Sequence, residues 1–401
     1  MNSYIYQYDN WPNFKWEDKV ILISLANVRN LEGILQGKME SIGFELREEA
    51  MLDTLTLDIV KSSEIEGEIL NPELVRSSIA RHLGMDIAGL LPSDRNVDGV
   101  VQMMLDATQN FNTPLTFDRL FDWHAALFPT GRSGMNKIEV GRFRNDQLGP
   151  MQVVSGALGK EKIHYQAPDA NMLEKEMTLF VNWFNHENNI DPVLKAAIAH
   201  LWFVTIHPFD DGNGRIARAI TDMQLARSDG SNQRFYSMSA QIKLDRKNYY
   251  NILEKTQSND LNITNFLKWF IKSLSNALLN SDKTLSKVLD KAYFWNLNSN
   301  ISLNERQKKM INKLFVGFKG NLTSSKWANI NKCSSDTALR DIQDLINKNI
   351  LSKDHAGGRS TKYNLIFQSH PPIILKNKDL KVPSVEDIKR VSSRKGKGLS
   401  L

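Results

Sequence analysis

A stretch of apolar residues near the middle of the chain limits the folds that this sequence can adopt. Residues 191–206 read DPVLKAAIAHLWFVTI and are apolar on nearly every side of a helix, which is typical of a helix in the middle of a bundle. Lys195 and His200 interrupt the apolar run, and it is too short to cross a bilayer. We therefore expect a mainly α-helical fold built around this helix, with no association with a membrane.

Helical patterns cover much of the rest of the first 300 residues. In residues 19–38, the apolar residues Val20, Ile23, Leu31 and Leu35 recur at helical spacings. Asn71 as N-cap and Pro72 as first residue predict the start of another helix. Further helices are expected at about residues 48–67, 94–110, 116–127, 169–185 and 216–227, with one or two more in residues 246–281.

Residues 128–170 differ from the helical segments around them. They are rich in glycine and then alternate through MQVVSGALGKEKIHYQAP. Alternation over a few residues with a glycine-containing turn is the pattern of a β-hairpin. We expect loops and one short hairpin there, with its turn near residues 156–162.

Length and composition indicate a soluble protein of two or three domains. The chain has 401 residues, of which 41% are hydrophobic and 24% charged, the usual values for a globular protein. Cys333 is the only cysteine, so an internal disulfide is excluded. The N-terminus lacks the basic start and apolar core of a signal peptide, and we expect a cytoplasmic protein.

The positive charge is confined to the last quarter of the chain. Residues 301–401 contain 20 Lys and Arg against 8 Asp and Glu, whereas the first 300 residues contain 31 against 37. After a polar linker at 296–302, three helical stretches at 303–315, 323–329 and 334–347 lead to two strand-like runs around a Gly-Gly turn. This order predicts a winged helix-turn-helix domain.

The predicted winged helix has two possible partners. Ser334, Ser335 and Asp336 would start its recognition helix, and basic residues would contact the phosphates of DNA. Asp336, Asp341 and Asp344 on the same helix favour the alternative, a protein-interaction module. The sequence leaves both partners open. The basic residues expected to contact DNA are Arg340, Lys353, His355, Arg359 and Lys362.

The densest cluster of chemically active residues follows the apolar helix directly. Residues 207–218 read HPFDDGNGRIAR. The glycines let the backbone approach a ligand closely, and the new helix that begins near Arg215 points its N-terminal amides at an anion. Arg215 and Arg218 are three residues apart and can reach the same anion. Asp211 supplies a carboxylate for Mg²⁺, and His207 can accept a proton from a nucleophile.

This segment resembles, position by position, the signature of the Fic family: HPF, one free residue, Asp or Glu, GNGR, two free residues and Arg. That family moves AMP from ATP to a protein hydroxyl and releases pyrophosphate. The resemblance implies an adenylyltransferase that modifies Ser, Thr or Tyr of a target protein or of itself. His207 would be the catalytic base, Asp211 would hold Mg²⁺, and Phe209 would pack the loop against the core. The implied phosphate-binding residues are Gly212, Asn213, Gly214, Arg215 and Arg218.

The same resemblance leaves some chemistry open. A related subfamily that acts as a kinase has Lys at the position of Gly214, so the glycine favours nucleotidyl transfer. The motif is also compatible with transfer of another phosphate-containing group.

Three shorter matches extend the resemblance to roughly residues 50–280. Residues 141–144, GRFR, match an element that precedes a β-hairpin flap, and the flap pins the target chain by strand addition. Two neighbouring tyrosines match the surroundings of the adenine and ribose, with Gln257 where relatives often have Asn. The implied flap residues are Val153, Val154, Ser155 and Gly156, and the implied nucleoside contacts are Tyr249, Tyr250 and Gln257.

Residues 62–67, SSEIEG, fit the inhibitory motif of the family: Ser or Thr, three free residues, Glu, then Gly or Asn. On a helix, Ser62 and Glu66 share a face. In relatives with this motif ahead of the active site, the Glu pairs with the second signature arginine, here Arg218. We therefore expect Ser62, Glu66 and Gly67 to form a brake that draws Arg218 away from the γ-phosphate of ATP. The alternative is an ordinary solvated glutamate near a helix end.

The expected domains are an N-terminal helical module with the inhibitory motif, a Fic catalytic domain, a winged helix and a basic, disordered tail. They cover residues 1–95, 96–290, 300–368 and 369–401. A second function stays open, in which the chain is a DNA-binding regulator whose Fic site serves as a nucleotide sensor. The sequence is silent on oligomeric state and leaves a homodimer open.

Overall fold

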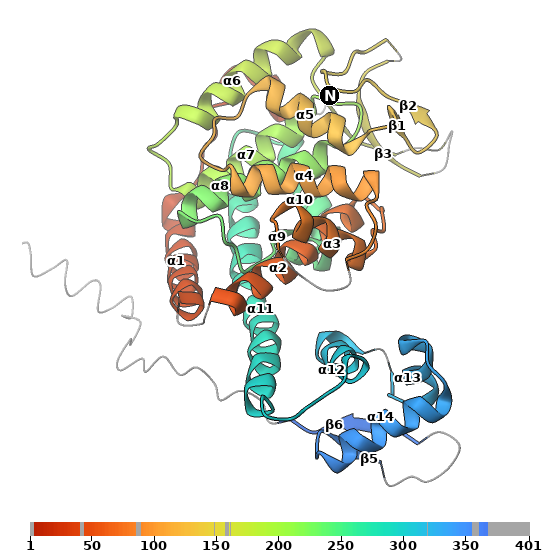
Figure 1. Cartoon of the computed structure of the whole chain (residues 1–401). Coiled ribbons are helices and arrows are strands. Elements are labelled where there is room, and N and C mark those ends of the chain that lie inside the picture. Colours follow the sequence, from red (N-terminus) through yellow and green to blue (C-terminus); the bar gives the residue numbers. More distant parts are fainter. Residues whose placement is uncertain are drawn as a thin grey trace, which may run out of the picture.

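The structure, a computed structural model, describes residues 4–40, 44–85, 90–147, 149–156, 160, 162–318, 320–354 and 361–367. Its long helix α11 (Thr264–Leu297) leaves a larger, mainly helical lobe and reaches a smaller lobe formed by the C-terminal part of the chain (Figure 1). The mainly α-helical fold is therefore confirmed. The expected basic tail, residues 369–401, lies outside the described residues.

Helix α7 (Pro192–Ile206) lies in the middle of the larger lobe. All residues from Val193 to Ile206 are buried, as its apolar sequence predicts. Asp191 caps the helix, because its Oδ1 accepts hydrogen bonds from the amides of Val193 and Leu194. Among the described residues, no helix has the length and hydropathy that a membrane span requires.

The other helices of the larger lobe surround α7. Helices α6, α8 and α11 pack against it, and α2 and α4 pack against α8. Their bounds are α1 (Asp18–Glu40), α2 (Phe44–Ile65), α3 (Pro72–His82), α4 (Arg95–Gln109), α5 (Phe117–Leu127), α6 (Leu173–His186), α8 (Asn213–Asp229), α9 (Met238–Leu244) and α10 (Arg246–Gln257).

One apolar core joins the N-terminal segment to the rest of the larger lobe. This core extends along the sequence from Ile5 to Leu289. Helix α1 packs on α11, and α2 packs on α3, α8 and α9. Trp11 and Phe14, ahead of α1, lie edge-on to Trp202 of α7, with ring centroids 6.1 and 5.8 Å away. The segment that carries the inhibitory motif is thereby packed directly on the helices that carry the signature.

Helix α1 buries a different face from the one that its apolar spacing suggested. Leu35 is buried as expected, but Val20 and Ile23 are 40% and 65% exposed, and Ile21 and Val28 are buried in their place. Apolar residues lie on both sides of this helix, and it packs mainly on α11, so spacing alone could not select the buried side. Helix α9 was not expected, because seven residues are too few to show a clear period.

Two antiparallel hairpins lie at one edge of the larger lobe within the described residues. Strands β3 (Gln152–Ser155) and β4 (Lys162–Gln166) form the expected hairpin, and its register shifts between Val153 and Val154. Strands β1 (Arg132–Ser133) and β2 (Asn136–Lys137) form a hairpin that the sequence did not suggest, because two residues per strand show no alternation. The expected turn residues 157–159 and 161 lie outside the described residues.

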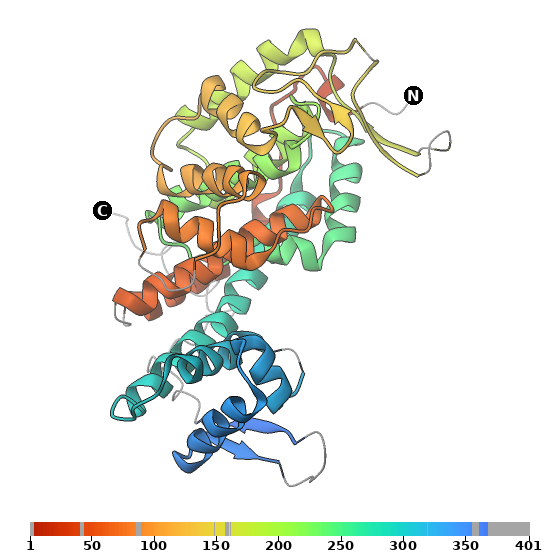
Figure 2. The ribbon, with the colours of Figure 1, turned by 45° about the vertical axis from the view of Figure 1, so that its right-hand side comes forward.

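The smaller lobe follows the expected order of helices and a hairpin (Figure 2). Its own core includes Met310, Trp327 and Leu345. The bounds are α12 (Glu305–Gly317), α13 (Ser324–Asn331), α14 (Ser335–Asn347), β5 (Leu351–Lys353) and β6 (Tyr363–Leu365), with β5 and β6 antiparallel.

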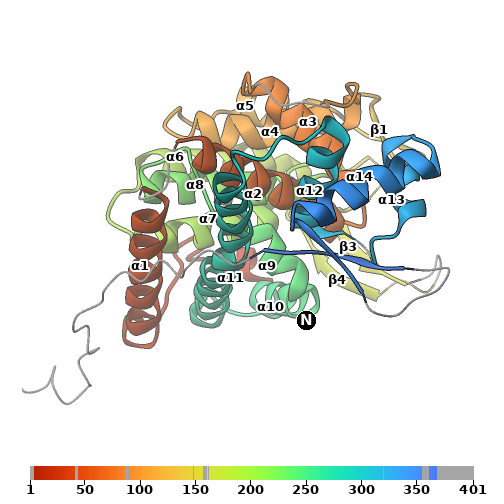
Figure 3. The same ribbon diagram turned by 60° about the horizontal axis from the view of Figure 1, so that its bottom comes forward.

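Helix α11 connects the two cores without a break. Leu289 belongs to the larger core, whereas Phe294, five residues further along the same helix, belongs to the smaller one. The helix ends at Leu297, so the polar linker expected at 296–302 begins slightly later than predicted. Seen from below, α12 follows α11, and α14 lies next to α12 (Figure 3).

Candidate active site

The loop between α7 and α8 is held in shape by its own residues. His207 and Gly212 both lie in the left-handed region, at φ 52° and 81°. A Cβ at Gly212 would also lie 2.9 Å from Cε2 of Phe128. The Asn213 side chain accepts a hydrogen bond from Phe209 N at 3.0 Å and donates one to Phe209 O at 2.7 Å. Asn213 thus closes the loop, and its expected contact with phosphate stays a prediction.

Phe209 anchors the loop in the core, as expected. It is fully buried and stacks on the ring of His124, with centroids 4.3 Å apart. Gly141 N donates to Nδ1 of His124, so Nε2 carries the proton and donates to Asp211 O at 3.2 Å. Burial lowers the pKa of His124 to about 4, which keeps the ring neutral. Sequence reasoning missed His124, since nothing near it in the sequence links it to the signature.

Arg144 of the GRFR element ties the loop to the segment that leads to the flap. Its side chain is 1% exposed. Its Nε donates to His207 O at 2.8 Å, and its amide donates to Pro208 O at 2.9 Å. It also pairs with Asp146 at 2.5 Å. The arginine therefore holds the backbone of His207 and Pro208 in place.

A backbone carbonyl sets the tautomer of the His207 ring. Its Nδ1 lies 3.3 Å from Val204 O, and a carbonyl only accepts, so Nδ1 carries the proton and Nε2 keeps its lone pair. Nε2 of Gln257 donates to the same carbonyl at 3.4 Å. Burial is the main cause that lowers the pKa of His207 to about 4. The imidazole is therefore neutral near pH 7 and able to take up a proton.

Asp211 offers a partly exposed carboxylate next to the loop glycines. Its Oδ1 accepts from Gly212 N at 2.6 Å, and its Oδ2 accepts from the hydroxyl of Ser133 on β1. No group of three or more His, Cys, Asp or Glu in the described part of the chain could form a metal site of protein ligands alone. A single carboxylate fits Mg²⁺, which commonly takes one or two carboxylates and completes its shell with phosphates and water.

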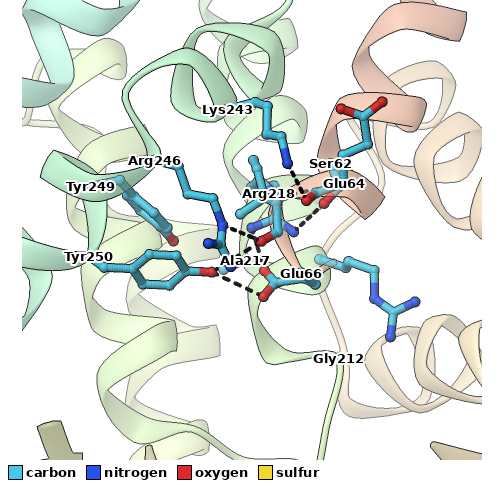
Figure 4. A network of polar contacts seen from close by, with 12 residues as sticks. Ser62, Glu64, Glu66, Gly212, Ala217, Arg218, Lys243, Arg246, Tyr249 and Tyr250 are labelled. Carbon is cyan, nitrogen blue, oxygen red and sulfur yellow. Dashed lines mark hydrogen bonds and ion pairs between the residues drawn. The ribbon is translucent and has the colours of Figure 1, made fainter. Parts of the chain in front are cut away.

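Arg218 is buried and bonded to the end of α2 (Figure 4). Its Nε donates to Ser62 Oγ at 2.8 Å, and its Nη2 donates to Ser62 O at 2.9 Å. Its Nη1 forms an ion pair with Glu66 Oε1 at 2.8 Å. The pairing expected for the brake is thus present. Helix α2 ends at Ile65, so Glu66 follows the helix in a turn closed by Gly67 at φ 90°, yet it still faces the same arginine as Ser62.

The Glu66 carboxylate occupies the space beside the N-terminus of α8. A Cβ at Gly214, the second residue of that helix, would lie 3.0 Å from Glu66 Cδ and closer still to its Oε1. The hydroxyl of Tyr250 lies 3.3 Å from Glu66 Oε2. A helix N-terminus favours anions, because its amides and dipole are positive there. Glu66 therefore fills the position at which an anionic ligand of α8 would bind.

A second carboxylate, which the sequence reasoning did not assign, holds the other signature arginine. Nη1 of Arg215 forms an ion pair with Glu68 Oε2 at 2.7 Å. The guanidinium also lies 5.0 Å from the centroid of the Phe128 ring. The turn at Gly67 directs Glu66 and Glu68 to the same end of α8. The acidic run EIEGE was a visible signal, but only the turn decides which carboxylate meets which arginine.

The residues expected around the adenine and ribose divide into two groups. Tyr249 is 2% exposed, and its hydroxyl bonds to Nε2 of His200 at 2.9 Å inside the core. Gln257 is 5% exposed and donates to Val204 O and to Oγ1 of Thr205. Tyr250 is the one of the three that lies beside Glu66. Contact of these residues with a nucleoside stays a prediction.

The expected flap residues lie on and beside β3. Val154 is 47% exposed, and Ser155 and Gly156 are exposed as well. The hairpin is tied to α10, because Glu254 accepts from Lys162 at 3.3 Å and bonds to His164 at 2.8 Å. Among the described strands, β3 pairs only with β4.

The residues around this site match a known family. Residues 114–225 match the model of the Fic/DOC family. The chain therefore contains a Fic domain. Residues 4–85 match a domain of unknown function, DUF4172, and this segment includes the inhibitory motif.

Curated relatives and a solved structure agree with this assignment. Protein adenylyltransferase fic-1 of Caenorhabditis elegans is 30% identical over 191 residues, which cover 44% of this chain and 33% of that protein. The protein of the same name from Caenorhabditis briggsae is 43% identical over 189 residues, with the same coverage. The chain thus spans about a third of the length of these relatives. A Fic family protein from Desulfovibrio desulfuricans G20 has the same fold, with a TM-score of 0.50, 19% identity, and coverage of 88% of this chain and 97% of that chain.

Proposed function

We propose that this chain is an autoinhibited protein adenylyltransferase, which transfers AMP from ATP to a hydroxyl of a target protein or of itself. The observation that carries the proposal is a neutral base, His207, next to a helix N-terminus that presents Arg215 and Arg218. The similar proteins from two Caenorhabditis species are named protein adenylyltransferases, which supports the same reaction here.

In the proposed reaction the hydroxyl oxygen of the target attacks the α-phosphorus of ATP. A bond forms between that oxygen and the phosphorus, and the bond from the phosphorus to the oxygen shared with the β-phosphate breaks. Pyrophosphate leaves, and AMP stays on the target. The hydroxyl proton passes to Nε2 of His207, because Nδ1 already carries a proton that it donates to Val204 O. The backbone bonds from Arg144 keep His207 in place.

The phosphates of ATP would be held at the N-terminus of α8. Gly214 leaves room for phosphate oxygens where the Glu66 carboxylate now lies, and Arg215 and Arg218 would oppose the charge of the departing pyrophosphate. Asp211 is the residue that would hold Mg²⁺, oriented by the hydroxyl of Ser133. When bound, the ion would neutralise charge on the phosphates.

The target chain would add to the open edge of β3. An extended peptide gains backbone hydrogen bonds when it pairs with such an edge. Val154 and Ser155 are exposed there. The bonds between β4 and Glu254 keep the hairpin attached to α10. This placement would bring a hydroxyl side chain of the bound segment towards His207.

The proposed resting state is inhibited because Glu66 and the γ-phosphate of ATP compete for Arg218. Arg218 is bonded to Ser62 and Glu66, so it is not available to the γ-phosphate. The Glu66 carboxylate also stands beside Gly214, at the anion-binding end of α8. ATP that binds around this carboxylate would not place its α-phosphorus in line with the attacking hydroxyl.

The test is the intact mass of the Glu66→Gly protein after incubation with Mg-ATP. We expect a gain of one AMP that forms much faster than in the parent protein. Glu64→Gly is the matched control, because Glu64 lies on α2 and bonds to Lys61 at 2.8 Å, away from both signature arginines. The mass increment also separates AMP from phosphate or another transferred group.

The double variant Glu66→Gly, His207→Ala should gain no AMP. Equal incorporation with and without His207 would overturn the role of the base. Equal incorporation with and without Glu66 would overturn the brake.

A further inference from the structure

The smaller lobe has a surface that the proposed adenylyl transfer does not use. Helices α13 and α14 are joined by Lys332, Cys333 and Ser334, the turn length of a helix-turn-helix. Lys332 takes the left-handed conformation at φ 50°, and Ser334 caps α14 by accepting from Thr337 N at 3.2 Å. These two helices pack against each other, and α14 packs against β5.

Of the three acidic residues of α14, Asp341 is turned towards the protein, Asp344 is partly exposed and Asp336 is exposed. Asp341 is 5% exposed and accepts two hydrogen bonds from Arg306, at 2.7 and 3.0 Å. Asp344 accepts from Gln307 at 2.8 Å and from Lys348 at 2.6 Å. Both carboxylates therefore serve the contact between α12 and α14. Asp341 is thus withdrawn from the solvent face, and the charge of the partly exposed Asp344 is balanced by Lys348.

The solvent face of α14 combines an arginine, an amide and an apolar side chain. Arg340 and Gln343 are exposed and three residues apart, so they lie on one side of the helix. Leu339, which is 47% exposed, precedes Arg340 in the sequence and so lies nearer to the N-cap of the helix. Bidentate Arg to guanine, Gln to adenine and an apolar contact with the thymine methyl group are the usual means of reading bases in the major groove. Asp336 is the exposed acid of this face, and a carboxylate can accept a hydrogen bond from cytosine.

Positive charge surrounds this face. Residues 301–367 contain 12 Lys and Arg against 5 Asp and Glu. Three of those acids, Glu305, Asp341 and Asp344, are paired with cations of α12 or with Lys348. Lys332 in the turn, Lys353 on β5 and Lys362 ahead of β6 are exposed. Such residues contact phosphates on both sides of a groove when a helix lies in it.

We propose that the smaller lobe binds duplex DNA, with the face of α14 that carries Leu339, Arg340 and Gln343 in the major groove. Lys332, Lys353 and Lys362 contact the phosphates on either side. The proposal concerns a different surface from the Fic site and does not depend on the proposed adenylyl transfer.

The test uses the full chain and a fluorescent duplex selected from a randomised pool, with anisotropy measured between 50 and 200 mM salt. We expect Arg340→Ala to weaken binding of the selected duplex by about fivefold to a hundredfold and to reduce the preference for it over an unrelated duplex. Lys332→Ala should weaken both duplexes alike and lower the slope of log affinity against log salt by about one.

Lys175→Ala is the control, because it removes the same charge from an exposed position on α6. His207→Ala should bind the duplex like the parent chain, which separates this result from any failure of adenylyl transfer. The proposal is overturned if no duplex binds at 50 mM salt, which would leave the face to a protein partner. It is also overturned if Arg340→Ala and Lys332→Ala bind like Lys175→Ala, or if single-stranded DNA of the same sequence competes equally.

Discussion

A glycine and a glutamate share one small space at the active site. Gly214 lies in the first turn of α8, and the Glu66 carboxylate rests where a side chain at that position would be. The absence of a Cβ is thus what allows Glu66 to reach Arg218. At the scale of single residues, the signature and the brake are therefore parts of one arrangement.

Replacement of Gly214 by Ala tests this arrangement through stability. The new Cβ collides with Glu66, so we expect a loss of about 1–3 kcal/mol in the free energy of unfolding. In the Glu66→Gly background the space is open, and the same replacement should cost less than about 1 kcal/mol. Chemical denaturation of the parent, the two single variants and the double variant gives the coupling free energy between positions 66 and 214. Equal costs in both backgrounds would show that Glu66 does not occupy the space.

Glu68 should act as a weaker second brake. Its side chain is 40% exposed, so its ion pair with Arg215 is more screened than the pair of Glu66 with Arg218. We expect Glu68→Ala to raise the initial rate of AMP incorporation by a few fold, clearly less than Glu66→Gly. Titration of ATP by calorimetry should show tighter binding. Glu73→Ala, an exposed glutamate on α3, is the matched control and should change neither quantity.

At the scale of elements, the C-terminal end of α2 is held by basic residues of α9 and α10 (Figure 4). Lys243 Nζ donates to Glu64 O at 2.6 Å, and Arg246 Nε donates to Ile65 O at 2.7 Å. The last carbonyls of a helix lack partners within the helix and carry partial negative charge, so cations stabilise them. These bonds set the position from which Glu66 reaches α8.

Arg246→Ala should therefore loosen the brake without touching Glu66. We expect a rise of a few fold in AMP incorporation in the parent background and no rise in the Glu66→Gly background, where no brake is left. Lys247→Ala, the exposed neighbour, is the control. A similar change in both backgrounds would mean that Arg246 acts on catalysis and not on α2.

At the scale of the whole molecule, the larger lobe contains buried histidines whose pKa values are lowered. Burial lowers the pKa of His124 to about 4 and that of His200 to about 3. His200 bonds to Thr221 and Tyr249, which links α7 to α8 and α10. The core that contains them spans the inhibitory segment and the Fic domain together. Protonation of either ring would therefore affect both the inhibitory segment and the Fic domain.

This arrangement predicts a loss of stability in mild acid. Below the ordinary histidine pKa of about 6.5, the unfolded chain takes up protons that the folded chain does not bind. The free energy of unfolding therefore decreases as the pH is lowered. For each of these two histidines we expect a loss of about 1.5 kcal/mol between pH 6.5 and 5. Glu32, whose pKa is raised by burial to about 7, acts in the opposite direction.

The histidine contribution is therefore measured as a difference between proteins. Denaturation of the parent, His124→Gln and His200→Gln at pH 7.5, 6.5 and 5 should show a smaller fall in each variant. The exposed His186 gives the control, because His186→Gln should retain the slope of the parent. A variant slope equal to that of the parent would contradict the prediction.

Local patterns predicted much of this fold and part of the site. The central helix α7, the helix that Asn71 and Pro72 begin, and the β3–β4 hairpin follow from periodicity, caps and turns, which depend on neighbours in the sequence. The buried face of α1 did not follow, since apolar residues lie on two sides of it. The roles of His124 and Ser133 were also missed, because both act on a loop about 80 residues away.

The sequence by itself determined the composition of the site: a base, a carboxylate, flexible glycines and two arginines within twelve residues, with an acidic run upstream. Tertiary structure alone decided the pairings. Glu66 meets Arg218 across 152 residues and Glu68 meets Arg215 across 147, because α2 packs against α8 and the Gly67 turn directs the two carboxylates. In the same way, packing of α12 on α14 turned Asp341 inwards, where it pairs with Arg306. Residue type is a local property, whereas the partner of a charge depends on which elements pack together.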